Sequence, residues 1–400
     1  MSIQELALDQ LGSVSRGRSR HRPRDAAFLY GGPFPFIQTG DVKRAGLYLR
    51  DYEQTYSEAG LAQSKLWPAG TLCITIAANI AETAILDIDA CFPDSVIGFT
   101  SDPKKADTRF VKYLFDAVLK MRFRSFTQGA AQDNLSQEKL LSIKFPVHEL
   151  SVQERIADIL SSYDNLIENN RQRIALLEEA ARLIYREWFV YFRFPGHEHV
   201  EVVDDVPAGW ERLSASEAFQ INPATPLSGE EEITYIPMAA LSEVGMLIDS
   251  GAFERRRHAT SVRFIHGDTL FARITPCLEN GKTGFVQCLS LGEVACGSTE
   301  FIVMRGRRVS NYFVYLTARQ ANFRENAIKS MIGSSGRQRV QPSCFDRYYV
   351  PIPPNHLSSL FDETVAPLFQ QVRVLDQQNG RLADARDLLL PRLISGEIAV

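Results

Sequence analysis

The sequence predicts an α+β fold: two mixed α/β segments in a tandem pseudo-repeat, separated and joined by two long helices that form an antiparallel coiled coil. Short motifs recur in the same order about 200 residues apart. A long apolar heptad pattern follows each segment. With 400 residues and 45% apolar content, the chain is long enough for two or three domains with real cores. It is therefore expected to be its own pseudo-dimer, suited to a target with two parts.

The two mixed segments are matched by the order of their motifs rather than by composition. We place the first at residues 1–149 and the second at residues 196–354. Short insertions and deletions account for the small drift between the matched positions. The matched motifs are Gly70-Thr71-Leu72 with Gly267-Asp268-Thr269, Tyr113-Leu114 with Tyr315-Leu316, and Gly129 with Gly333.

The two helices are predicted at residues 150–195 and 355–400. In each, apolar residues recur by steps of four and three, which is the pattern of a coiled-coil seam. The two seams have the same period and phase, and each spans about 48 Å of helix. The first seam is Ile156, Leu160, Tyr163, Ile167, Asn170, Ile174, Leu177, Ala181, Ile184 and Trp188; the second is Phe361, Val365, Leu368, Val372, Leu375, Asn379, Leu382, Arg386, Leu389 and Leu393.

The seams are predicted to pair antiparallel, because a two-fold repeat that closes on itself favours that orientation. Each seam contains one asparagine, and a polar pair in a seam commonly fixes alignment at some cost in stability. The alternative is that each asparagine faces water at a frayed seam. The predicted register pairs Asn170 with Asn379, Trp188 with Phe361, Ile156 with Leu393, and Ala181 with Leu368.

Helix start and stop signals support both helices. Ser151 to Glu154 reads as a capping box, and Pro195-Gly196 as a stop. Pro353-Pro354-Asn355 supplies a stop followed by a cap for the second helix, which Ser395-Gly396 closes.

Composition indicates a cytoplasmic protein without a membrane partner. No apolar run approaches the length of a membrane span, and the N-terminus lacks the apolar core of a signal peptide. The six cysteines form no C-x-x-C pair, so reduced and mostly buried thiols are expected.

Charge is uneven along a chain whose net charge is −4. Residues 305–347 are rich in Arg and Lys, whereas residues 201–250 are acidic. Near the N-terminus, arginine stands at every second position: Arg16, Arg18, Arg20, Arg22 and Arg24. Such segments can neutralise DNA phosphates. The alternative is a solvated basic face, but the presence of one basic segment in each half favours DNA.

A small polar loop accompanies the basic residues in each half. Short amide and hydroxyl side chains can read base edges, and arginine can pair bidentately with guanine. The first-half candidates are Thr127, Gln128, Gln132 and Asn134; the second-half candidates are Lys329, Ser334, Ser335, Arg337, Gln338 and Arg339.

Five motifs, taken in order, resemble the specificity (S) subunit of type I restriction-modification enzymes over essentially the full chain. The run at residues 267–282 is long and specific. The other four motifs are moderately specific alone, and their shared order strengthens the resemblance. In place of an acid-Gln pair after Pro353-Pro354, the chain has Asn355-His356-Leu357-Ser358-Ser359, which makes the start of the second helix less secure. The motifs are F-P-F-I-Q-T-G-D-V at residues 34–42, S-V-Q-E-R-I-A-D-I-L at 151–160, G-D-T-L-F-A-R-I-T-P-C-L-E-N-G-K at 267–282, G-S-T-E-F at 297–301 and L-I-S-G-E-I at 393–398.

The resemblance implies two target recognition domains, each of which reads one half of a split site in double-stranded DNA. The helices would act as a spacer and as the docking surface for two methyltransferase subunits. The chain itself would bind no cofactor, and S-adenosylmethionine is expected in the partner methyltransferase. Whether restriction (translocase/endonuclease) subunits join is left open. Arg273 and Lys282 flank the specific run, where DNA contact and a structural role are both open.

A second apolar stripe on the first helix is a candidate docking site for a partner. Leu176, Leu183 and Val190 stand seven apart and off the seam. The alternative is that the chain's own domains cover this stripe.

Motifs for catalysis and metal binding fail on inspection, so a non-catalytic subunit without a metal site is predicted. Gly281-Lys282-Thr283 lacks the glycine that a phosphate-binding loop needs, because Pro276 stands there. Pro93-Asp94 followed by Asp102-Pro103-Lys104 suggests a nuclease acid-acid-lysine set, but the spacing is short and Pro103 interrupts the strand. His197-Glu198-His199 lacks further ligands. No N-P-P-F or D-P-P-Y type tetrapeptide of an adenine methyltransferase occurs. The alternatives are a coiled-coil scaffold that reads no DNA, and a detached recognition part of a fused nuclease-methyltransferase.

Overall fold

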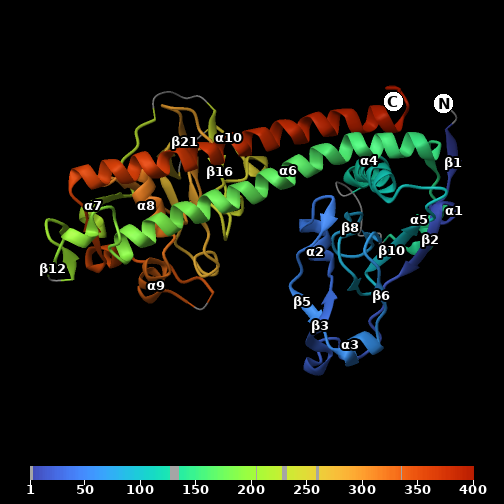
Figure 1. Cartoon of the computed structure of the whole chain (residues 1–400), viewed down its shortest axis with the longest axis horizontal. Helices are drawn as coiled ribbons and strands as arrows, with labels where there is room; N and C mark the ends of the chain where they lie inside the picture. Colours follow the sequence, from blue (N-terminus) through green and yellow to red (C-terminus); the bar gives the residue numbers. More distant parts are fainter. Residues whose placement is uncertain (1–2, 127–134, 204, 228–231, 258–260, 335) are drawn as a thin grey trace. The chain divides into compact units, whose positions relative to one another are not determined.

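The computed structural model describes all residues except 1–2, 127–134, 204, 228–231, 258–260 and 335. The chain divides into two compact units, and each long helix contributes to both. Unit 1 comprises Met1–Asn169 and Gln378–Val400; unit 2 comprises Asn170–Gln377. Figure 1 colours the chain from its N-terminus in blue to its C-terminus in red.

Unit 1 contains two small sheets with helices packed on them. Helix α4 covers the first sheet, because Phe110, Tyr113 and Leu114 are buried in one apolar cluster with Leu72 and Ile97 of its strands. In the second sheet, β3 and β9 are parallel and the other neighbours antiparallel. The first sheet has the order β2 (Gly12–Arg16), β10 (Val96–Ser101), β7 (Leu72–Thr75), β8 (Thr83–Leu86), β4 (Tyr48–Leu49); the second has the order β5 (Gln54–Tyr56), β3 (Tyr30–Phe36), β9 (Ala90–Cys91), β6 (Leu66–Trp67).

Short elements complete unit 1. Strand β1 (Gln4–Leu6) pairs with β11 (Phe145–Val147), which joins the two ends of the first mixed segment. The helices are α1 (Leu8–Leu11), the 3-10 turn η1 (Ala27–Leu29), α2 (Thr39–Arg44), α3 (Glu58–Ala62), α4 (Thr108–Phe126) and α5 (Gln137–Ser142).

Unit 2 repeats this topology, except that its first sheet has no counterpart of β4 among the described residues. One sheet again has an outer strand followed by three antiparallel neighbours, and the other again has one parallel pair, β16 with β21. The repeat predicted from motif order is therefore confirmed by topology. The first sheet has the order β15 (Phe219–Ile221), β22 (Phe301–Gly306), β19 (Thr269–Ala272), β20 (Thr283–Phe285); the second has the order β17 (Glu254–Arg256), β16 (Ile233–Ile236), β21 (Val294–Gly297), β18 (Val262–Ile265).

The remaining elements of unit 2 follow the same plan. Strand β14 (Glu211–Ser214) pairs with β23 (Tyr349–Ile352) as β1 pairs with β11, and two helices stand where unit 1 has α4. These helices are α8 (Asn311–Ala318) and α9 (Ala321–Lys329). The others are the hairpin β12 (Val202–Val203) with β13 (Val206–Pro207), α7 (Ala215–Ala218), and the turns η3 (His197–His199), η4 (Met238–Ala240), η5 (Ser250–Ala252) and η6 (Pro342–Arg347).

The two long helices are α6 (Leu150–Tyr185), continued by the π-helical turn η2 (Arg186–Val190), and α10 (Asn355–Ile394). Every predicted seam position is buried or half-buried. Within the described chain, neither these helices nor any shorter one is apolar over a length that could span a membrane.

In unit 1 the start of α6 packs beside the end of α10. Ile156 and Leu393 share one apolar cluster. Asp164 forms an ion pair with Arg386, and the Arg155 guanidinium donates to the Val400 carbonyl at 3.1 Å. Residue numbers thus rise along one helix as they fall along the other, which is antiparallel packing.

In unit 2 the end of α6 packs beside the start of α10. The rings of Trp188 and Phe361 lie 5.7 Å apart, as the predicted register requires. Ala181 is buried with Leu368 against the same cluster, although Phe369 rather than Leu368 is the more deeply buried of the two neighbours. Asn170 belongs to unit 2 and Asn379 to unit 1, so their pairing stays a prediction.

Two predicted helix ends differ in the structure. Helix α6 begins at Leu150, so Ser151 lies inside it, and the Gln153 side chain is buried, where its Nε2 donates to the carbonyls of His148 and Lys105. Helical structure stops at Val190, before Pro195, because Phe194 turns away to pack on Trp210 with ring centroids 5.1 Å apart. The capping box and the proline stop were therefore wrong.

Candidate nucleic-acid interface

The arginines at alternate positions in unit 1 lie on one side of an extended segment that continues β2. Arg16, Arg18 and Arg20 are exposed, whereas Gly17 and Ser19 between them are buried. A side chain at position 17 would meet the Pro93 carbonyl oxygen at 2.3 Å, so the backbone lies against its neighbour there. The segment therefore presents cations outward along one edge.

Hydrogen bonds fix the backbone of this segment. The Gly17 amide donates to the Val96 carbonyl at 2.8 Å, and the Arg18 amide donates to the Phe92 carbonyl at 2.9 Å. Gln63 Oε1 accepts from the amides of Arg20 and His21 at 2.5 and 2.9 Å, and Ser64 Oγ donates to the Arg18 carbonyl at 2.7 Å. The arginines are thus presented from a preorganised backbone.

The arginines differ in how far they are held by the protein itself. Arg16 Nε donates to the Asp94 carbonyl at 3.0 Å, and Arg22 donates to the carbonyls of Ser19 and His21. Within the part of the chain that the structure describes, no hydrogen bond or ion pair engages the guanidinium groups of Arg18 and Arg20. These two arginines are the cations most available to a phosphate.

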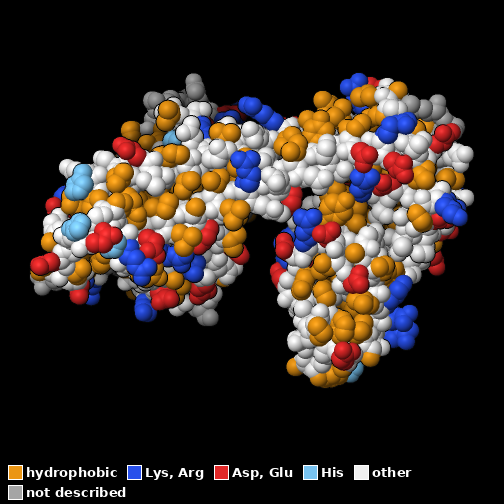
Figure 2. Space-filling view, viewed as in Figure 1, with side chains coloured by type: hydrophobic (Ala, Val, Ile, Leu, Met, Phe, Trp, Pro, Cys, Tyr) orange, Lys and Arg blue, Asp and Glu red, His pale blue; other side chains and the backbone are white. Residues whose placement is uncertain are grey.

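A lysine that the sequence reasoning missed extends this basic edge. Partial burial, and then the charge of Arg18, lower the pKa of the Lys65 ammonium group. Lys65 Nζ lies 3.4 Å from the centroid of the Trp67 ring. In Figure 2, Lys and Arg side chains gather at the edge of unit 1 where β6 lies. No local motif announces this neighbour, because Lys65 is far from Arg18 in sequence.

In unit 2 the specific run, the G-S-T-E-F motif and the second candidate loop meet at one end of β19. The Arg273 amide donates to the Glu300 carbonyl at 3.0 Å, and the Val340 amide donates to the Arg273 carbonyl at 2.8 Å. Arg339 Nη2 lies 2.7 Å from Glu300 Oε1 in an ion pair. Three segments far apart in sequence are therefore joined by backbone and side-chain bonds.

The second candidate loop is a short hairpin. Ile332 and Arg339 exchange backbone hydrogen bonds of 3.1 and 3.0 Å at its base. Ser334 and Arg337 are exposed, and the Arg337 amide donates to the Ser334 carbonyl at 3.0 Å in the turn. Gly336 has φ of +77°, a left-handed conformation that favours glycine. The hairpin presents Ser334 and Arg337 to solvent.

Three predicted site residues make internal contacts. Arg339 is paired with Glu300, Arg273 Nη2 donates to the Val340 carbonyl at 3.3 Å, and Lys282 Nζ donates to the Met238 carbonyl at 3.3 Å. All three are half-buried. Their observed contacts hold the specific run and the hairpin in place.

The other candidates divide into described and undescribed residues. Lys329 ends helix α9, so the loop is shorter than predicted. Gln338 is half-buried, and its backbone N–H donates to Thr275 Oγ1 at 3.1 Å. Outside the described residues lie Thr127, Gln128, Gln132, Asn134 and Ser335.

Not every cation of the basic run at residues 305–347 is free on the surface, because Arg305 is bonded to a buried carboxylate. The Asp268 carboxylate accepts two bonds from Arg305, at 2.7 and 2.8 Å, and its side chain is fully buried. A missed group of exposed arginines lies instead on edge strand β17 and just after it, at Arg255, Arg256 and Arg257. The signal for it was the visible run of three arginines.

The predicted docking stripe is exposed in unit 2. Leu176, Leu183 and Val190 have exposed fractions of 71%, 46% and 42%. They lie on α6 and its π-helical end. A stripe of this kind is available to a partner.

The Glu300–Arg339 pair yields a prediction about the hairpin. Replacing Glu300 by alanine removes the carboxylate that anchors the base, so the amides of Ile332 and Arg339 should exchange with solvent several-fold faster. Hydrogen exchange read by mass spectrometry would measure this. Replacing half-buried Glu293, whose carboxylate accepts from the Ser290 amide elsewhere in unit 2, is the control. Equal exchange in both variants would contradict the anchoring role.

Comparison with known proteins shows that this chain is similar to type I restriction enzyme specificity subunits. Residues 4–179 match the model of the type I restriction modification DNA specificity domain. The chain is 23% identical over 394 residues to the type I restriction enzyme MjaIX specificity subunit of Methanocaldococcus jannaschii, covering 93% of this chain and 88% of that one. It is 30% identical over 199 residues to the EcoEI specificity subunit of Escherichia coli, covering 48% of this chain and 33% of that one.

A solved structure shows the same fold. The S subunit of a type I restriction-modification system from M. genitalium aligns with a TM-score of 0.57 at 14% identity, over 98% of this chain and 96% of that chain. At this identity the likeness concerns the fold.

Proposed function

Because the chain belongs to the family of type I restriction-modification specificity subunits, we propose that it reads a DNA site in two separate halves and directs two methyltransferase subunits to it. The mixed segment of unit 1 is the first recognition domain, and that of unit 2 is the second. The observation that carries the proposal is the repeated topology with an exposed basic element in each unit.

The two basic elements have different roles in this proposal. In the first domain, Arg18 and Arg20 contact phosphates, with Arg16 and Arg22 beside them; phosphate contacts orient a protein but carry no sequence information directly. In the second, Arg337 and Ser334 reach base edges from a turn. A good bidentate contact discriminates by about 1 to 3 kcal/mol.

Three of the predicted site residues hold the DNA-reading elements in place and do not contact bases themselves. They are Arg273, Lys282 and Arg339. Their observed bonds run to the protein's own backbone and to Glu300, and a rigid supporting shell improves the precision of a site. Removing one of them should therefore disturb the hairpin before it disturbs a base contact.

The partners supply the chemistry in this proposal. The exposed stripe of Leu176, Leu183 and Val190 contributes to the docking of a methyltransferase subunit, which binds S-adenosylmethionine. The chain itself binds no cofactor and catalyses no step. A restriction subunit would join through the assembled complex.

Methylome sequencing of a host that carries this chain with its methyltransferase tests the proposal. We expect a methylated motif made of two specific parts with a fixed gap. Exchanging residues 1–149 for those of a relative with another motif should change one part only, because each domain reads its own half.

The exchange for residues 196–354 is the matched control and should change the other part. A motif without a gap, or an exchange that alters both parts together, would contradict the proposal. Methylation by this chain alone with S-adenosylmethionine would contradict the assignment of the chemistry to a partner.

A further inference from the structure

Helix α6 carries two buried acids at the same heptad position. Asp164 and Glu178 each follow a seam residue, Tyr163 and Leu177, and their side chains are 9% and 5% exposed. Charged side chains are rarely buried without a specific partner. Both carboxylates therefore need an explanation.

In unit 1 the partner of the acid is a tyrosine of the first recognition domain. The Tyr113 hydroxyl of helix α4 donates to Asp164 Oδ2, and Arg386 of α10 forms an ion pair with the other oxygen. Burial, and then the Asp164 charge, raise the pKa of the Tyr113 hydroxyl, which therefore keeps its proton and donates. One domain helix and both long helices meet at this carboxylate.

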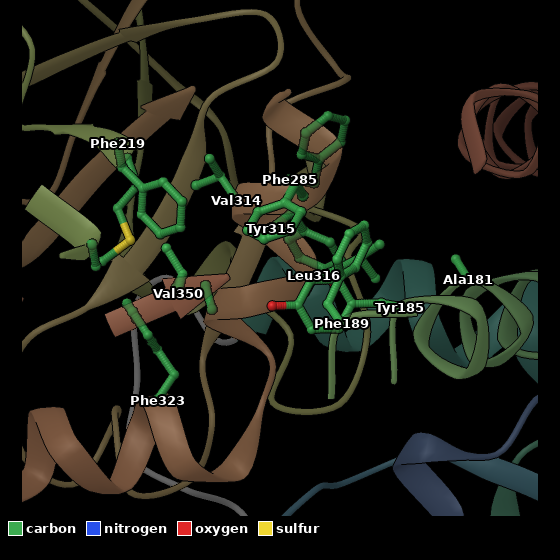
Figure 3. Packing of buried hydrophobic residues seen from close by; sticks show 14 of the residues in the cluster. Ala181, Tyr185, Phe189, Phe219, Phe285, Val314, Tyr315, Leu316, Phe323 and Val350 are labelled. Atoms are coloured by element: carbon green, nitrogen blue, oxygen red, sulfur yellow. The ribbon is translucent and has the colours of Figure 1, made fainter. Parts of the chain in front are cut away.

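In unit 2 the same kind of contact involves Glu178. The Tyr315 hydroxyl of helix α8 donates to Glu178 Oε1 at 2.7 Å, and the Met246 amide donates to Oε2 at 2.8 Å. Arg182, one turn further along α6, pairs with the same carboxylate. Both oxygens of Glu178 thus bind the second recognition domain. Figure 3 labels Tyr315 in the buried cluster to which Tyr185 and Phe189 also belong.

The two tyrosines are matched in the repeat, but the two acids are not. Tyr113 and Tyr315 stand at corresponding places in α4 and α8. The seam correspondence matches Asp164 with Phe369 of α10, whose ring lies 5.8 Å from that of Tyr315, and Glu178 with Ala383. Neither acid of α6 therefore has an acidic counterpart in α10. Each acid accepts a hydrogen bond from a tyrosine of a different recognition domain.

The physical role of such contacts is registry. An apolar seam repeats every heptad, so apolar packing discriminates weakly between positions along a helix. A buried ion or hydroxyl pair costs desolvation and stabilises little compared with apolar residues, but a displaced domain would leave the acid and the hydroxyl unpaired. The polar contact therefore selects one position.

We propose that Asp164 and Glu178 are positioning residues that hold the two recognition domains at defined places on helix α6 and thereby determine the gap tolerated between the half-sites. The proposal rests on the proposed function. The two tyrosine–carboxylate contacts would make the complex selective for the length of the gap. This selectivity is separate from the recognition of the bases in each half-site.

Tyr113→Phe and Tyr315→Phe test it, since each removes one hydroxyl and keeps the ring. The assembled complex with its methyltransferase subunits would be assayed on duplexes with the cognate half-sites and gaps shortened or lengthened by one base pair. Each variant should keep the half-site sequences and lose on the order of tenfold in discrimination against the wrong gaps. Asp164→Asn and Glu178→Gln, which keep an acceptor oxygen, should lose less.

Tyr56→Phe is the matched control, because it removes a buried hydroxyl of unit 1 that lies 3.4 Å from Ser19 Oγ and not on a long helix. It should leave gap discrimination unchanged. Unaltered gap discrimination in both α4 and α8 variants would overturn the inference. If the unmodified complex methylates no split site at all, the proposed function fails instead.

Discussion

Alanine at both Arg18 and Arg20 is expected to weaken DNA binding by the assembled complex about equally for cognate and unrelated duplexes. The two guanidinium groups are exposed on a fixed backbone and are the cations available to phosphates. Losing two phosphate contacts should reduce the slope of log affinity against log salt by about 2, and affinity at low salt on the order of tenfold or more. Binding titrations at several salt concentrations would measure both.

The control removes the same charge elsewhere in unit 1. Arg44 and Arg50 are exposed and paired with acids, Arg44 with Glu53 at 2.7 Å and Arg50 with Asp87 at 2.7 Å. Alanine at both should leave the salt slope nearly as it is. An Arg18→Lys and Arg20→Lys variant should retain most of the slope, since charge rather than shape is used. A loss confined to the cognate duplex would show that these arginines read bases.

Phe361→Ala is expected to destabilise unit 2 by about 3 to 5 kcal/mol, the usual cost of removing a large buried ring. Phe361 is 1% exposed, and its ring lies 4.7 Å from that of Phe189 and 5.7 Å from that of Trp188. The cavity would open where α6, α8 and α10 meet. Urea unfolding followed by tryptophan fluorescence, to which Trp188 and Trp210 of unit 2 contribute, would measure the loss.

Leu360→Ala is the matched control, because it lies next to Phe361 on the same helix but is 40% exposed. It should cost less than about 1 kcal/mol. Similar losses for the two variants would mean that Phe361 is not part of the packed seam. The result would then contradict the register that places Trp188 on Phe361.

The repeat and the two seams were predictable because they depend on periodicity. Ile156, Leu160 and Phe361 bury their side chains for the reason that their spacing implies: they recur on one face of a helix. The helix ends were less predictable. Ser151 belongs to a motif that favours capping, yet Gln153 satisfies buried carbonyls near it, and a tertiary contact outweighed the local preference.

The candidate site was predictable only in part. The alternation of Arg16, Arg18 and Arg20 indicated a shared face, which the structure has. The sequence held no sign that Arg16 is bonded back to Asp94 or that Lys65 lies beside Arg18. Arg337 and Arg339 look equivalent in sequence, but only Arg339 meets Glu300.

A tandem repeat with two heptad helices and basic elements in both halves could be predicted from the amino-acid pattern, since periodicity and motif order are one-dimensional properties. The availability of individual arginines, and the burial of Asp164 and Glu178 against tyrosines, could not be predicted in this way. Those properties depend on contacts between residues distant in sequence. The strength of a charge or a hydrogen bond follows from what surrounds it, and folding alone brings those surroundings together.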